Sequence, residues 1–156
     1  MPNLKQSQLA AIELLNRRKA RKSLIEFTKY TNDLYLPAAH HYLIADKLEK
    51  VASGEITRLM ICMPPRHGKS ELASRRFVPW YFGNHPSKQI IAACYNSDLA
   101  SDFGREVRNI VASEEYQKLF ETRLAADSKA AGKWHTDKNG IYLSCGIDSG
   151  ATYLLP

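Results

Sequence analysis

The feature that most limits the possible folds of this chain is an apolar run that ends in two prolines and is followed by Gly-Lys-Ser. Residues 58–63 read Arg-Leu-Met-Ile-Cys-Met, and Pro64 and Pro65 follow them directly. A continuous apolar run bounded by turn residues is typical of a strand buried on both faces of a parallel sheet. From Lys69 onward the apolar residues return at helical spacing. We therefore expect a buried strand, a loop and a helix, in that order.

The loop between this strand and helix contains the groups that bind a triphosphate. Gly68 lets the backbone approach phosphate, Lys69 can reach the outer phosphates, and Ser70 can hold a bridging Mg²⁺ ion. The usual motif has glycine five residues before the Gly-Lys pair, where this chain has Met63, so the match is to a variant. A chance Gly-Lys-Ser turn is the alternative. We predict an ATP and Mg²⁺ site formed by these loop residues: Pro64, Pro65, Arg66, His67, Gly68, Lys69, Ser70 and Glu71.

Two loop residues are candidates for a catalytic role. Lys69 would contact the phosphates that react, and Arg66 could stabilise their charge in the transition state, as arginine fingers do in cis. The alternative for Arg66 is a surface arginine with no ligand. We predict Lys69 and Arg66 as catalytic residues and Ser70 as the magnesium ligand, acting through the nucleotide.

The rest of the chain alternates between strand and helix patterns. Residues 89–94 form a second apolar run, and residues 99–111 have the apolar spacing of an amphipathic helix that Ser97 or Asp98 would cap. Asn-Gly at 139–140 predicts a hairpin-type turn before a further strand. This order predicts an α/β fold with a mostly parallel sheet, helices on both faces, and a helical amino-terminal preface.

Charge is concentrated near the amino terminus. The chain carries a net charge of +6, and its first thirty residues hold seven Lys or Arg against two Glu. Such a basic segment could contact the phosphates of double-stranded DNA; a solvated helix face is the alternative.

No apolar run approaches the roughly 18 residues that span a bilayer, so we expect no membrane association and a cytoplasmic protein. The three cysteines contain no Cys-x-x-Cys pair, so no zinc site is expected.

Several segments resemble the large terminase subunit of tailed bacteriophages, the ATPase that drives DNA into the capsid. Residues 63–71, Met-Pro-Pro-Arg-His-Gly-Lys-Ser-Glu, look like its phosphate loop. Residues 37–48 are similar to its adenine-contacting segment, residues 93–108 to its second strand and helix, and residues 134–140 to its next hairpin. The resemblance covers about residues 20–145.

This resemblance implies a partial P-loop NTPase domain, with a basic helical preface in residues 1–54 and an incomplete ATPase core in residues 55–156. It implies an ATP-binding amino-terminal part of a DNA-packaging motor, located in the cytoplasm of the bacterial host. Its partners would be double-stranded DNA, the portal protein, the small terminase subunit and, if the protein is complete, further copies of itself. His41 would lie near adenine; the alternative is a helix-start residue without a ligand.

The chain departs from the family after the hairpin. In the family a glycine-rich turn leads to a strand that ends in an Asp-Glu pair, and a nuclease domain follows. Here at most Gly146, Gly150 and Thr152 resemble that turn, and Asp148 is better explained as a turn residue than as a replacement acid. We therefore expect ATP binding with slow hydrolysis or none. The alternatives are a truncated remnant that binds nucleotide or DNA without catalysis, another P-loop ATPase such as a helicase, and a basic DNA-binding accessory protein.

Overall fold

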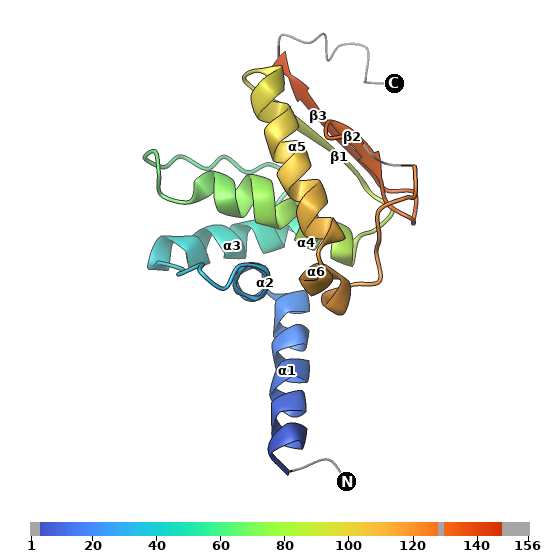
Figure 1. Cartoon of the computed structure of the whole chain (residues 1–156). Coiled ribbons are helices and arrows are strands. Elements are labelled where there is room, and N and C mark those ends of the chain that lie inside the picture. Colours follow the sequence, from blue (N-terminus) through green and yellow to red (C-terminus); the bar gives the residue numbers. More distant parts are fainter. Residues whose placement is uncertain (1–3, 128–129, 148–156) are drawn as a thin grey trace.

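The structure is a computed structural model that describes residues 4–127 and 130–147. Helices dominate this part of the chain (Figure 1). The helices are α1 (Leu4–Lys22), α2 (Leu24–Thr31), α3 (Ala39–Ala52), the π-helix η1 (Glu71–Arg76), α4 (Phe77–Asn84), α5 (Ser97–Ala112) and α6 (Glu114–Leu119). The strands are β1 (Gln89–Cys94), β2 (Lys133–His135) and β3 (Ile141–Gly146).

The three strands form one small mixed sheet in the order β1-β3-β2. β1 runs parallel to β3, with Ile90 opposite Tyr142, and β2 runs antiparallel to β3, with Trp134 opposite the same tyrosine. Asn139 has a φ of 63°, the left-handed conformation that tight hairpin turns require. The predicted strand at residues 89–94, the following strand from Ile141 and the hairpin turn between β2 and β3 are therefore confirmed.

The predicted mostly parallel sheet with helices on both faces is wrong. In the described residues the sheet has three strands, one of its two strand pairs is antiparallel, and most of the ordered structure is helical. α5 packs against β1 and β3 and lies along one face of the sheet (Figure 1). On the opposite face Ile91 is 52% exposed, so no helix of the described residues covers the middle of β1 there. Strand and helix patterns alternate in the sequence, but this alternation does not determine how many of the predicted strands pair with another strand.

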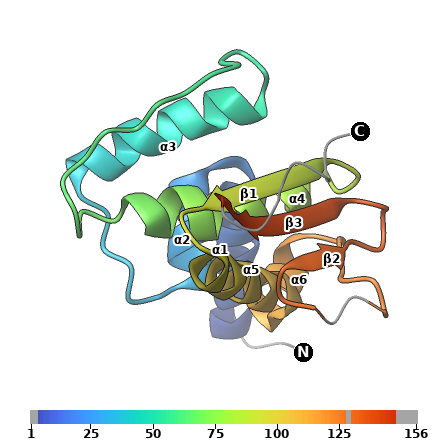
Figure 2. The same cartoon turned by 90° about the horizontal axis from the view of Figure 1, so that it is seen from above.

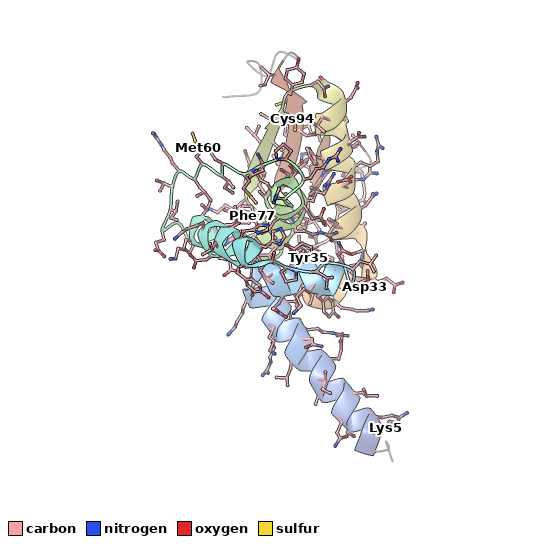
Figure 3. The ribbon with its side chains drawn as sticks, turned by 90° about the vertical axis from the view of Figure 1, so that its left-hand side faces the viewer. Lys5, Asp33, Tyr35, Met60, Phe77 and Cys94 are labelled. Atoms are coloured by element: carbon pink, nitrogen blue, oxygen red, sulfur yellow. The ribbon has the colours of Figure 1, made fainter. Side chains whose placement is uncertain are left out.

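The apolar run at residues 58–63, which we expected to be a buried strand, is not a strand. It runs back along α3 (Figure 2), and no backbone hydrogen bond joins it to another described segment. Met60 is 86% exposed and points away from the body of the protein (Figure 3). The reason is that a strand exists only where another strand pairs with it, and no described strand lies beside this segment.

The core joins the helices to the sheet. Phe27 of α2, Phe82 of α4, Tyr116 of α6 and Trp134 of β2 are fully buried, together with Tyr142 of β3. The rings of Trp134 and Tyr142 are stacked, with centroids 4.9 Å apart. These contacts pack α2, α4 and α6 against the sheet, and α4 directly continues η1, the helix that follows the Gly-Lys-Ser loop.

α1 projects away from this core (Figure 1). Its last turns pack on the body, where Ala20 is fully buried, whereas Leu9 near its start is 60% exposed. None of the helices in residues 4–127 and 130–147 is both long and apolar enough to cross a bilayer.

At the helix ends, the cap of α5 differs from expectation and the start of the helix after the Gly-Lys-Ser loop agrees with it. α5 is capped by Asn96, whose side chain accepts a hydrogen bond from the Leu99 N–H at 2.8 Å, rather than by Ser97 or Asp98. Helical structure begins at Lys69 and continues through η1 and α4 to Asn84.

Candidate nucleotide-binding site

The Gly-Lys-Ser loop is a turn that leads directly into a helix. Arg66 and Gly68 both have positive φ angles, 63° and 78°. Glycine adopts this conformation without a steric penalty. A Cβ atom on residue 68 would also lie 2.5 Å from Nε2 of His41, so the position excludes a side chain for a second reason. The conformation and the close approach together explain why this position is glycine.

Two histidines at the start of α3 brace the loop from behind. His41 is 9% exposed, and its Nδ1 accepts a hydrogen bond from the Ala38 N–H at 2.9 Å. That acceptor role leaves the ring proton on Nε2, which lies 3.1 Å from the His67 carbonyl and donates to it. Nε2 of His40 lies 3.3 Å from the same carbonyl. Because both ring nitrogens of His41 contact backbone groups, this residue fixes the position of the loop relative to α3.

A cavity of about 480 Å³ lies in front of the loop. It is lined by Arg75 and by the residues from Met63 to Glu71. Among the described residues, Lys69 and Arg66 are exposed and form no hydrogen bond or ion pair, and the hydroxyl of half-buried Ser70 has no partner. Two cations and one hydroxyl at this cavity are therefore available to a ligand.

Backbone donors at the start of the helix point to the same kind of ligand. The first hydrogen bond of the helix joins the Leu72 N–H to the Gly68 carbonyl at 3.0 Å. The N–H groups of Lys69, Ser70 and Glu71 precede this bond, and no described backbone carbonyl accepts from them. Unpaired N–H groups and the positive end of the helix dipole favour a bound anion such as phosphate.

The residues at this cavity fit a magnesium-bound triphosphate. Lys69 and the backbone donors match the phosphates, and Ser70 is placed to supply a hydroxyl to the metal. No group of three or more His, Cys, Asp or Glu side chains in the described residues could hold a metal ion without the nucleotide. Magnesium bound to the triphosphate would neutralise part of the phosphate charge.

Glu71 is the one acidic residue among the described residues that line the cavity, and two arginines contact it. Nε of Arg76 donates to Glu71 at 2.8 Å, and Nη1 of Arg76 also donates to the carbonyl and hydroxyl of Thr31 at 3.2 and 3.1 Å. Nη1 of Arg75 lies 3.4 Å from the other oxygen of Glu71. The Glu71 carboxylate is therefore already paired, and Arg76 joins η1 to α2.

The sequence did not identify Arg75, which also lines the cavity. Its guanidinium pairs with Glu106 of α5 and lies 5.0 Å from the centroid of the Phe103 ring. This placement depends on the π-helical turn of η1 and on where α5 packs, and neither has a signal in the spacing of the sequence. π-helical segments are rare and occur often at functional sites.

The predicted site residues fall into three groups. The residues from Pro64 to Ser70, with Glu71, line one cavity, as expected of a single site. His41 lies behind the loop, in contact with Gly68 rather than among the residues that line this cavity, and its role beside adenine stays a prediction. Asp148, Gly150 and Thr152 lie outside the described residues.

Comparisons of this chain with protein-family models, curated proteins and solved structures give no match. The resemblance to the large terminase subunit therefore stays a prediction from the sequence.

Proposed function

We propose that this protein binds Mg-ATP in the cavity in front of residues 63–71, as the amino-terminal part of a DNA-packaging motor of the large-terminase kind. One observation carries the binding of Mg-ATP, and the sequence resemblance over residues 20–145 supports the kind of motor. One cavity is lined by Lys69, by the hydroxyl of Ser70 and by the first N–H groups of the helix, none of which has a partner among the described residues. The turn that leads into this helix contains Gly68 in the left-handed conformation. A site with a cation, a hydroxyl and several N–H donors is complementary to a magnesium-bound triphosphate.

Each residue has a distinct role in this proposal. The ammonium group of Lys69 offsets the charge of the outer phosphates, and the hydroxyl of Ser70 faces the metal. Arg66 extends into solvent at the mouth of the loop, where it can approach a phosphate from outside. His40 and His41 hold the His67 carbonyl, so the loop does not have to be ordered when the ligand binds.

Among the described residues, the cavity offers no unpaired carboxylate that could position a water for hydrolysis. Positioning the attacking water usually requires a carboxylate or an amide. The one acidic side chain among the described residues at this cavity, Glu71, is paired with Arg76. We therefore expect the protein to bind ATP and to hydrolyse it slowly or not at all. A remnant that binds nucleotide without catalysis would behave in the same way, and a helicase-like ATPase would instead release phosphate faster when DNA is added.

The experiment is a fluorescence titration with a mant-labelled ATP analogue in the presence of Mg²⁺. Wild-type protein should bind saturably, and Lys69→Ala should raise Kd at least tenfold, which corresponds to about 1.4 kcal/mol. Ser70→Ala should reduce the dependence of binding on Mg²⁺. Lys88→Ala is the matched control, because Lys88 is an exposed lysine that does not line the cavity. Equal affinity of Lys69→Ala and wild type would refute the proposed site.

DNA binding by α1 forms a second part of the proposal. Arg17 pairs with Glu13, and Nε of Arg21 donates to the Leu119 carbonyl, so these two basic residues already have partners within the protein. Arg18, Lys19 and Lys22 are exposed, without a partner among the described residues, on the helix that projects from the body. Changing these three to Gln should weaken duplex binding and lower its salt dependence. An unchanged salt dependence would exclude α1 as the DNA contact.

A further inference from the structure

We infer that Arg75 is a third cation of the phosphate site, and that Glu106 of α5 competes with the bound phosphate for it. This inference rests on the proposed nucleotide binding and adds a phosphate-binding residue, Arg75, and a residue on α5, Glu106, that acts through it. It starts from the observation that one guanidinium, that of Arg75, lines the cavity while it pairs with a carboxylate from another helix.

The direction of the Arg75 side chain favours contact with a ligand. In a helix, side chains lean toward the amino terminus, and residues four apart share a face. The π-helix η1 shows the same lean: Nη1 of Arg75 lies 3.4 Å from the carboxylate of Glu71, at the start of η1, and Arg75 lines the same cavity as Lys69. With Arg66, Lys69 and Arg75 against Glu71 alone, the described residues that line the cavity give it an excess of positive charge.

Arg75 is held in place by contacts that a phosphate can replace. Its Nε donates to the carboxylate of Glu106, and the Phe103 ring lies under the guanidinium, 5.0 Å away. The side chain of Glu106 is 45% exposed, and that of Arg75 is 34% exposed. An exposed ion pair of this kind is worth little, because water screens both charges. A triphosphate carries more charge than one carboxylate and presents several oxygens, so it is the stronger competitor for the guanidinium.

Glu71 is a poorer competitor for Arg75. Nε of Arg76 lies closer to Glu71, at 2.8 Å, than Nη1 of Arg75 does, at 3.4 Å. Arg76 also donates to Thr31 and is more buried than Arg75, so it remains on Glu71. Glu106 is therefore the group that Arg75 must leave, at least in part, to contact phosphate.

This competition couples the ligand to α5. α5 contacts η1 and also packs against β1 and β3, so it connects η1 with the sheet (Figure 1). A phosphate that takes Arg75 from Glu106 weakens one contact between α5 and η1. By linkage, a change that weakens the pair in the free protein must tighten phosphate binding.

The test is a double-mutant cycle measured by the same mant-ATP titration with Mg²⁺. Glu106→Gln should lower Kd by about threefold or more, because Arg75 no longer has a charged partner on α5. Arg75→Ala should raise Kd by about tenfold. The double variant should bind like Arg75→Ala, because Glu106 acts only through Arg75. If the pair of Arg75 and Glu106 had a purely structural role, Glu106→Gln would not tighten ATP binding.

The control is Asp102→Asn, which removes one negative charge from the same helix while leaving Arg75 and its partner intact. Asp102 is exposed and pairs with Arg105. Its change should alter Kd by less than twofold. Far-UV circular dichroism and thermal unfolding verify that each variant is folded, and tighter binding by Glu106→Gln cannot result from unfolding.

Three results would overturn the inference. The first is Glu106→Gln binding ATP no more tightly than Asp102→Asn, and the second is Arg75→Ala binding like wild type. The third is Glu106→Gln lowering Kd as much in the Arg75→Ala background as it does in wild type. In each of these the proposed site stands if Lys69→Ala still loses affinity. If wild type and Lys69→Ala both fail to bind, the proposed function and the inference fall together.

Discussion

Replacing Gly68 by Ala should lower the free energy of unfolding for two separate reasons, the left-handed backbone of this residue and its contact with His41. Replacing Gly68 by Ala places a side chain on a residue with a φ of 78°. A left-handed conformation costs a residue other than glycine about 1–2 kcal/mol. The new Cβ would also lie 2.5 Å from Nε2 of His41, so either the loop or the imidazole must move.

The second part of the cost follows from how His41 is held. The ring is buried and contacts the Ala38 N–H and the His67 carbonyl through its two nitrogens. Moving it leaves at least one polar group without a partner, at about 1–3 kcal/mol. Gly68→Ala should therefore lower the free energy of unfolding by about 2–5 kcal/mol, the sum of these two costs, and it should reduce ATP affinity as well.

The chain provides a matched control for the first part. Gly54 has a φ of 82°, and a Cβ there would meet nothing within 4 Å, so Gly54→Ala measures the left-handed conformation alone. In a His41→Ala background, Gly68→Ala should cost no more than Gly54→Ala. Urea denaturation followed by circular dichroism gives all the values. If Gly68→Ala costs the same as Gly54→Ala in the wild-type background, the contact with His41 is not what excludes a side chain.

Three further predictions concern stability. The Tyr30 hydroxyl donates a hydrogen bond to Glu13 at 2.6 Å and is the main cause of the lowered pKa of that carboxyl in the folded protein. The hydrogen bond therefore contributes its full stability above the pKa of Glu13 in the unfolded chain, about 4.3. This stability is lost as the pH falls through the lower pKa of Glu13 in the folded protein. Urea denaturation from pH 6 to pH 3 should therefore show a smaller loss of stability for Tyr30→Phe than for wild type; equal losses would contradict this. The hydroxyl of Tyr142 is buried without a hydrogen-bond partner among the described residues, and burial raises its pKa, so Tyr142→Phe should leave thermal stability unchanged or higher, and a loss above about 1 kcal/mol would contradict it. Trp134→Ala, in the fully buried ring pair with Tyr142, should cost about 3–5 kcal/mol in urea denaturation, and a cost below about 1 kcal/mol would place this ring outside the core.

Local patterns in the sequence were enough to predict several elements. The strands at β1 and β3 follow from apolar runs between turn residues, and the hairpin turn follows from Asn139-Gly140. The loop followed by a helix from Lys69 also follows from local chemistry, because Gly68 permits the left-handed turn. These features depend on backbone conformations and spacings within a few residues, and such information is present in the sequence itself.

The tertiary structure decided the features that depend on contacts between distant segments. The run at residues 58–63 has the composition of a buried strand, yet it pairs with no strand in the part of the chain that the structure describes and is partly exposed, because pairing requires a neighbour that composition cannot supply. His41 braces Gly68 and Arg75 lines the cavity only because α3 and α5 pack beside the loop. The sequence by itself therefore determined a loop with the chemistry of a phosphate site. Packing determined which side chains support that loop, because support depends on distances between elements far apart in the chain.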